Sequence, residues 1–173
     1  IEIKNGTATA VHTVTNGKKT SYHADLVVLA AGGMGTPQIL ASSGIPCSHT
    51  LFVDPVLCVA APFANAKQNR QISMPFISQQ DGYILSPYMD WLSFFFHKAW
   101  RHPMQDIASV MIKLADDAQG GIYQHTVQKT LTPKDCAALQ DGVQQSKEIL
   151  KRLGADSSQL FLGTVNAGHP GGM

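Results

Sequence analysis

The sequence predicts a mixed α/β fold in which a small α/β unit precedes an antiparallel sheet. Three observations lead to this prediction: an alternating first segment with two Asn-Gly pairs, an uninterrupted apolar run that ends at two glycines, and several short β-favouring stretches after about residue 50. The chain has 173 residues, of which 44% are hydrophobic and 14% are charged. This is enough for one ordinary domain with a core.

The first segment alternates between apolar and polar side chains, as half-exposed strands do. Asn5-Gly6 and Asn16-Gly17 provide the left-handed backbone that tight hairpin turns require. We therefore expect a three-stranded β-meander here.

The next segment, Ala24–Ala31, is apolar without alternation, which is typical of a strand buried on both faces of a parallel sheet. It ends at Gly32 and Gly33, and Thr36 and Pro37 then provide the cap and the first position of a helix. A strand, a glycine turn and a helix together form half of a nucleotide-binding unit.

From about residue 50 the β-favouring stretches are separated by Pro, Gly, Asn and Asp, which predicts an antiparallel sheet in a second domain. These stretches are 51–59, 72–77, 83–88 and 108–114. A dense aromatic patch, Trp91–Trp100, interrupts them. It is consistent with a core, with the lining of a substrate pocket, or with a surface that contacts a membrane or a partner.

The last third predicts a long helix and a short strand. Thr132, followed by Pro133 and Asp135, is a strong helix start, and apolar residues continue at helical spacing over 133–153. Residues 158–164 are then the expected strand, and the chain ends in a glycine-rich segment.

Composition excludes several classes of function. Thirteen Lys and Arg against twelve Asp and Glu leave no basic excess for nucleic acid, and no apolar stretch reaches the roughly 18 residues of a transmembrane helix. Cys47, Cys58 and Cys136 are widely spaced and predict neither a disulfide framework nor a zinc site, so we expect a reducing, cytoplasmic compartment. None of the histidines has partners at metal-ligand spacing, and no metal is expected.

Residues 24–45 resemble the second signature of the glucose-methanol-choline (GMC) flavin oxidoreductases. The departures are Gly33, where the family has a small Ala, and Pro46, where it has Gly. The residues that follow the apolar strand and match the signature are Gly32, Thr36, Pro37, Ile39, Leu40, Ser43, Gly44 and Ile45.

A second resemblance lies at the C-terminal end. His169-Pro170-Gly171-Gly172 is similar to the His-Pro-x-Gly-Thr motif of the same family, with Met173 in place of Thr. The G-x-G-x-x-G fingerprint of dinucleotide-binding proteins does not occur in this sequence. We therefore expect a C-terminal fragment of a family member, inactive by itself.

The resemblance implies a Rossmann-like FAD-binding domain, of which residues 1–49 are the C-terminal part. Residues 50–157 would form an antiparallel-sheet substrate-binding domain, and 158–173 a return strand and the start of the active-site motif. The implied reaction is oxidation of a CH–OH group with hydride transfer to FAD. The implied partner is a small-molecule alcohol, apolar if the aromatic patch lines the pocket, and the electron acceptor is unspecified.

By the same resemblance, His169 is the catalytic base, and an imidazole pKa near neutrality suits removal of a hydroxyl proton. Asn166 is an active-site neighbour. The implied cofactor-binding residues are Gly32, Gly33, Thr36 and Pro37.

Two alternatives stay open. A flavoprotein of the succinate or fumarate type would need Arg and His near a dicarboxylate, and the central region offers only Arg70 and Arg101, far apart in sequence. A non-catalytic binding module would retain a flavoprotein-like fold without the cofactor.

Overall fold

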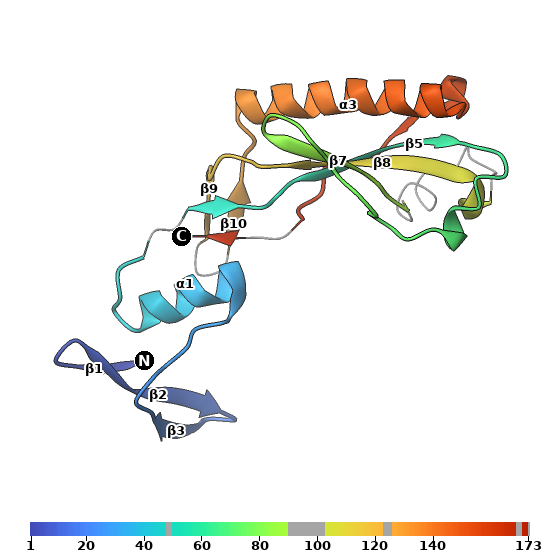
Figure 1. Cartoon of the computed structure of the whole chain (residues 1–173). Helices are drawn as coiled ribbons and strands as arrows, with labels where there is room; N and C mark the ends of the chain where they lie inside the picture. Colours follow the sequence, from blue (N-terminus) through green and yellow to red (C-terminus); the bar gives the residue numbers. More distant parts are fainter. Residues whose placement is uncertain (48–49, 90–102, 123–125, 169–170, 173) are drawn as a thin grey trace. The chain divides into compact units, whose positions relative to one another are not determined.

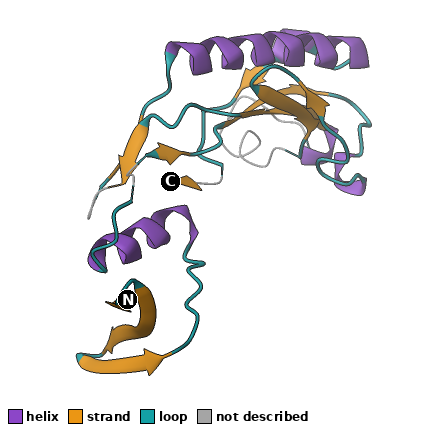
Figure 2. Cartoon of the chain, turned by 60° about the vertical axis from the view of Figure 1, so that its left-hand side comes forward, coloured by secondary structure: helices purple, strands orange, loops and turns teal. Residues whose placement is uncertain are grey.

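The structure, a computed structural model, describes residues 1–173 except 48–49, 90–102, 123–125, 169–170 and 173. The chain divides into two compact units. Unit 1 comprises the described residues of 1–52, 118–130 and 170–173, and unit 2 those of 53–117 and 131–169. Both units contain helix and strand (Figures 1 and 2), which is the mixed α/β composition that the sequence predicts.

Unit 1 begins with a three-stranded antiparallel sheet in the order β1-β2-β3. β1 spans Glu2–Lys4, β2 spans Thr7–Thr15 and β3 spans Lys18–His23. The connecting turns are Asn5-Gly6, with φ of 52° and 79°, and Asn16-Gly17, with φ of 51° and 77°. Two successive left-handed residues are what a two-residue hairpin loop needs. The predicted β-meander is confirmed.

The apolar run Ala24–Ala31 forms no strand, which corrects the prediction of a parallel strand here. A strand inside a parallel sheet needs neighbouring strands to pair with, and other elements to cover both of its faces. Every strand pair among the described residues is antiparallel, and none of these pairs includes this segment. Leu26 and Val28 are therefore 78% and 76% exposed.

The helix after this run, α1, spans Gly32–Ser42 and begins four residues before the predicted cap at Thr36. Gly32 has a φ of 72°, so the chain turns at the first glycine and is already helical when it reaches Thr36. Pro37 consequently lies inside the helix, where its missing N–H removes one backbone hydrogen bond. The predicted start of the helix was wrong because Pro, although most common at the first helical position, also occurs at other positions.

Two short antiparallel pairs bring distant parts of the chain into unit 1. β4 (Leu51–Phe52) pairs with β12 (Gly171–Gly172), and β9 (Gly120–Ile122) pairs with β10 (Val127–Lys129). The ammonium group of Lys129 also donates to the carbonyl of Leu51, at 3.4 Å.

Unit 2 is built on a five-stranded antiparallel sheet in the order β11-β5-β8-β7-β6. These strands are Phe161–Leu162 (β11), Val56–Pro62 (β5), Ile107–Leu114 (β8), Tyr83–Pro87 (β7) and Ser78–Gln79 (β6). Single 3₁₀ turns at Gln68–Arg70, Met104–Asp106 and Ser157–Gln159 lie in its connections. The antiparallel sheet is as predicted, but the stretch 72–77 is not a strand and 51–59 is divided by the turn at Asp54.

One face of this sheet is covered by α3, which spans Pro133–Leu153 (Figure 1). Thr132 and Asp135 form a complete capping box, and Gly154 ends the helix with a φ of 84°. This confirms the predicted helix at both ends. The core between helix and sheet is formed by alternate strand residues with two helix leucines and Ala155: Leu57, Val59, Ala61, Tyr83, Leu85, Ala108, Val110, Ile112, Leu114, Leu139, Leu150 and Ala155.

The second face of the sheet is also buried, although its residues are smaller and more polar. They include Cys58, Ala60, Ser86, Ser109 and Met111. The hydroxyl of Ser86 donates to the carbonyl of Phe76, at 2.7 Å, and that of Ser109 donates to the carbonyl of Tyr88. These two bonds fix the neighbouring loops on the second face.

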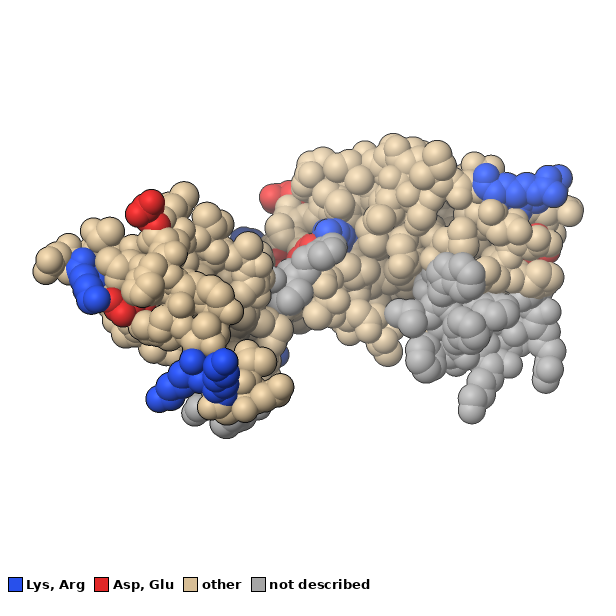
Figure 3. Space-filling model, turned by 90° about the horizontal axis from the view of Figure 1, so that it is seen from below, with Lys and Arg blue, Asp and Glu red and all other residues tan. Residues whose placement is uncertain are grey.

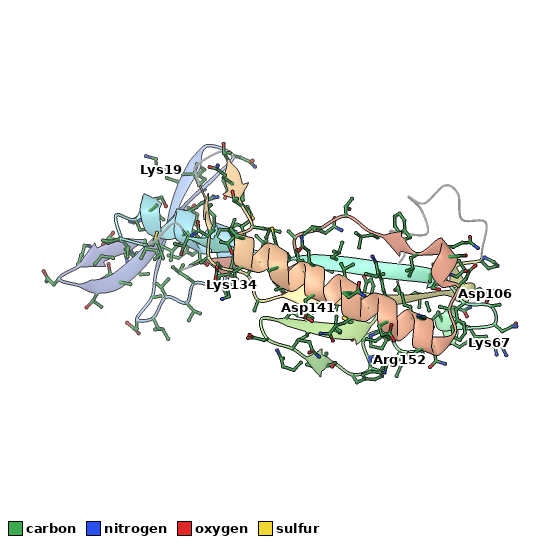
Figure 4. The ribbon with its side chains drawn as sticks, turned by 90° about the horizontal axis from the view of Figure 1, so that it is seen from above. Lys19, Lys67, Asp106, Lys134, Asp141 and Arg152 are labelled. Atoms are coloured by element: carbon green, nitrogen blue, oxygen red, sulfur yellow. The ribbon has the colours of Figure 1, made fainter. Side chains whose placement is uncertain are left out.

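Tyr83 connects the sheet to α3. Its hydroxyl donates to Asp141 at 2.5 Å and accepts from Gln145 at 2.9 Å. Figure 4 shows Asp141 on α3 between Lys134 and Arg152, which lie toward its two ends. Burial of the phenol, and then the adjacent Asp141 carboxylate, raise the pKa of Tyr83 to about 12.

This raised pKa predicts a loss of stability at high pH. In the unfolded chain the tyrosine loses its proton near pH 10, whereas the folded protein holds it to about pH 12, so the free energy of unfolding falls as pH rises between these values. We expect Tyr83→Phe to reduce this pH dependence. Urea unfolding of both proteins between pH 9 and about 12 measures the difference, and identical slopes would contradict the assignment.

The buried hydroxyl of Ser146 leads us to expect that replacing this residue stabilises the protein. Its side chain on α3 is fully buried, and its hydroxyl has no hydrogen-bond partner among the described residues. Ser146→Ala removes the cost of burying that hydroxyl, and we expect the free energy of unfolding to rise by about 1 kcal/mol. Gln144→Ala, at an exposed position of the same helix, controls for helix propensity. A greater gain in the control than at Ser146 would refute this explanation.

Candidate functional site

The predicted cofactor-binding residues all lie in the first half of α1, in unit 1. The backbone at Gly32 is left-handed, a conformation that favours glycine, and nothing lies within 4 Å of the position that a Cβ would take there. Pro37 is buried, whereas Gly33 and Thr36 are half-buried. The structure therefore brings these four residues together on one short segment.

The start of α1 has the chemistry of an oxygen-binding turn. No side chain caps the helix, and its first turn contains no acidic residue. The first backbone N–H groups of a helix lack partners within the helix and favour negative charge. These uncapped donors, next to a glycine without a side chain, fit phosphate or carbonyl oxygens of a nucleotide cofactor.

The segment that leads to His169 lies in unit 2, along the edge of β5 that does not pair with β8. β11 pairs Phe161 with Ala60 and Leu162 with Val59. Beyond β11, the N–H of Gly163 donates to the carbonyl of Cys58 at 2.9 Å. The backbone of this segment is thus bound to β5 over most of its length.

Asn166 continues this pairing through its backbone. Its N–H donates to the carbonyl of Val56 and its carbonyl accepts from the N–H of Val56, both at 2.8 Å. Its exposed side chain donates to the carbonyl of Thr164 at 2.9 Å. The predicted role of Asn166 as an active-site neighbour stays a prediction, and His169 itself lies outside the described residues.

The turn before β5 faces the end of this segment. The N–H of Gly168 donates to the carbonyl of Val53 at 2.8 Å. A Cβ on Gly168 would lie 2.4 Å from the carbonyl oxygen of Asp54, which is closer than such atoms approach. Any residue larger than glycine at position 168 would therefore require this backbone to shift.

Two charged side chains, Asp116 and Lys113, contact the turn. The carboxylate of Asp116 accepts from the N–H of Asp54 at 2.9 Å and from the N–H of Val53 at 3.2 Å. The ammonium group of Lys113 lies 2.8 Å from the Asp54 carboxylate. Sequence analysis missed Asp54, Lys113 and Asp116, because about 60 residues separate the first from the other two and only strand pairing brings them together.

The described residues form neither a metal-ligand group nor a membrane-spanning helix. Among them, no three His, Cys, Asp or Glu side chains are grouped as metal ligands. None of the helices in the described ranges combines the length and the apolar character of a membrane span. On the face in Figure 3, the Lys and Arg residues of the described chain form small separate groups. The aromatic patch Trp91–Trp100 falls outside the described residues.

Comparison with known families finds a similarity in the first part of the chain. Residues 1–77 match the family model described as GMC oxidoreductase, and this range contains the glycine turn and α1. The match extends over less than half of the chain and shows a similarity of this part to the GMC oxidoreductase family. The GMC model that matches is that of the family's N-terminal domain, so the comparison does not confirm the prediction of a C-terminal fragment.

A curated relative is similar to this chain over most of its length. An uncharacterized protein of Methanocaldococcus jannaschii is 25% identical over 163 residues, which cover 92% of this chain and 43% of the relative. The chain therefore spans less than half the length of this relative.

The glycine turn predicts a specific response to substitution. Because Gly32 has a φ of 72° and open space around it, Gly32→Ala would destabilise α1 through backbone strain alone, by about 1–2 kcal/mol. Asn tolerates this conformation better, so Gly32→Asn should cost less although its side chain is larger. Hydrogen exchange of the α1 amides measures both effects. A larger cost for Asn than for Ala would show that space, rather than conformation, selects glycine.

Proposed function

We propose that the chain is part of an FAD-dependent oxidoreductase that oxidises an alcohol CH–OH group. The observation that carries this proposal is the match of residues 1–77 to the GMC oxidoreductase family model, within which the uncapped turn of α1 lies. When bound, FAD would accept the hydride that leaves the alcohol carbon. The domain limits at 49 and 157 remain part of the proposal.

In this proposal, the start of α1 binds FAD through four residues: Gly32, Gly33, Thr36 and Pro37. Gly32 and Gly33 allow close approach of the backbone, and the first N–H groups of α1 donate to cofactor oxygens. Pro37 is buried and anchors the helix at this end. The absence of an acidic residue from the first turn avoids repulsion of an anionic group.

His169 is proposed to take the proton of the substrate hydroxyl, as the resemblance of its His-Pro motif implies. An imidazole that is neutral near pH 7 accepts a proton readily, and this assists departure of hydride from the adjacent carbon. Asn166, three residues earlier, belongs to the segment that is bound to β5.

A groove in unit 2 supports an apolar alcohol as the substrate. It has a volume of about 200 Å³ and lies beside the second face of the sheet, where Ser86 and Ser109 fix its walls. Its lining residues are mainly apolar, with two amides and two hydroxyls among them: Gln68, Gln71, Ile72, Ser73, Pro75, Phe76, Pro87, Tyr88 and Met89. Apolar walls with few polar groups are typical of small-molecule sites.

The test is flavin reduction in the full-length protein. We expect the purified protein to bind FAD, and His169→Asn to slow anaerobic flavin reduction by primary alcohols about 100-fold or more while FAD stays bound. His23→Asn, at an exposed position at the end of β3, is the matched control and should leave the rate unchanged.

Two results would overturn the proposal. A protein that takes up no FAD would favour a non-catalytic module. An unchanged rate in His169→Asn would remove this histidine from the reaction, while retained FAD would keep the flavoprotein part of the proposal.

A further inference from the structure

The β-meander of unit 1 places a serine, a histidine and a glutamate in one chain of hydrogen bonds. Nδ1 of His12 lies 2.9 Å from the hydroxyl oxygen of Ser21, and Nε2 of the same ring lies 3.0 Å from the carboxylate of Glu2. His12 belongs to β2, Ser21 to β3 and Glu2 to β1. A hydroxyl, an imidazole and a carboxylate in this order are the groups that activate a serine nucleophile.

Strand pairing in this small sheet fixes the arrangement. His12 is paired directly with Ser21 between β2 and β3, and Ala10 is paired with Glu2 between β1 and β2. Because residues two apart on a strand share a face, His12 lies beside both of its partners. The Asn-Gly turns at the two ends of β2 set this register.

Glu2 is ionised in this sheet. Its carboxylate also accepts from the hydroxyl of Thr9 at 3.1 Å and pairs with the ammonium group of Lys4. The hydrogen bond from Lys4, and then that from Thr9, lower the pKa of Glu2 to about 2. A carboxylate without a proton can only accept hydrogen bonds. The hydrogen of the neutral His12 ring is therefore on Nε2, which donates to Glu2.

This tautomer determines the direction of the other hydrogen bond. With its hydrogen on Nε2, the His12 ring has its lone pair on Nδ1, so the hydroxyl of Ser21 donates to it. A proton that leaves Ser21 thus has an acceptor within hydrogen-bond distance, and the imidazolium that forms lies against the Glu2 carboxylate. In the Ser-His-Asp triad the two ring nitrogens have exchanged roles, and either nitrogen of a neutral imidazole can fill each role.

The face around Ser21 is open to a small molecule. Ser21 and His12 are both exposed. The next cross-strand pair on this face is Val14 with Lys19, which is labelled in Figure 4. Val14 is 67% exposed and offers an apolar contact to a short acyl group. The ammonium group of Lys19 favours an oxygen that gains negative charge during acyl transfer.

We propose that Ser21 is a nucleophile that accepts short, apolar acyl groups from activated esters, with His12 as its base and Glu2 as a positioning residue. Oγ of Ser21 bonds to the acyl carbon, and the ester C–O bond breaks. The Ser21 proton passes to Nδ1 of His12 and then to the departing oxygen. This activity transfers no electrons and is separate from the flavin chemistry proposed above.

The acyl group leaves in a second step. Water bonds to the acyl carbon, the bond from this carbon to Oγ of Ser21 breaks, and a carboxylic acid is released. The proton of the water passes to His12 and then to Oγ, so both residues return to their first state.

The first test is reaction of the purified full-length protein with p-nitrophenyl acetate. We expect rapid release of p-nitrophenolate, with an acetyl group on Ser21 that mass spectrometry of the peptides locates. His12→Ala should slow acetylation of Ser21 about 100-fold or more, because the base is lost. Ser21→Ala should abolish the rapid release.

Two matched controls lie in the same unit. Ser42→Ala removes an exposed hydroxyl that donates to the carbonyl of Ile39 at 3.0 Å. His23→Ala removes an exposed histidine two residues after Ser21 on the same strand. Both variants should be acetylated on Ser21 at the wild-type rate.

The second test does not depend on the ester. The ¹⁵N chemical shifts of the His12 ring should show a neutral form with its hydrogen on Nε2. Glu2→Gln removes the charge that selects this tautomer, so we expect the preference to weaken and acetylation of Ser21 to slow at least about tenfold.

Three results would overturn the proposal. Acetylation confined to lysines or to other serines would remove Ser21 as the nucleophile. A His12→Ala rate equal to that of the wild type would remove His12 as the base. A His12 ring with its hydrogen on Nδ1 would overturn the positioning role of Glu2, even where Ser21 reacts.

Discussion

The pairing of both edges of β5 is the constraint on which unit 2 depends. One edge is bound to β8 over seven residue pairs, and the other is bound to the segment that starts with β11. Because side chains alternate along β5, the same strand supplies Leu57 and Val59 to the core under α3 and Cys58 and Ala60 to the second face. A one-residue slip of β5 would exchange these two sets and displace the segment that leads to His169.

Local signals explain which elements the sequence could predict. The β-meander depends on two Asn-Gly turns, and α3 depends on a capping box at Thr132 and an end at Gly154. Each of these signals acts within a few residues and needs no distant partner. The run Ala24–Ala31 has an equally clear pattern, but a buried strand requires neighbouring strands, and the described residues offer none to it. Its pattern indicates a preference for a buried strand, and this structure provides no strand for it to pair with among the described residues.

The residues of the candidate site also fall into two groups, those that local sequence signals predict and those that only the fold brings together. Gly32, Thr36 and Pro37 were found because they are close in sequence and match a known signature. Asp116 and Lys113 could not be found, since nothing in the spacing between residues 54 and 116 indicates contact. The register of β5 and β8, which pairs Val56 with Lys113, brings them to the turn. Strand pairing, rather than a motif, therefore specifies which residues hold this turn.

The physical reason that favours glycine differs between positions 32 and 168. Gly32 is required by its backbone conformation, because there is open space where its Cβ would be. Gly168 is required by space, because the carbonyl oxygen of Asp54 occupies the position beside it. In the first case a residue that tolerates the left-handed region can substitute, whereas in the second any side chain must displace backbone. The Gly168 position is therefore the less tolerant of substitution of the two.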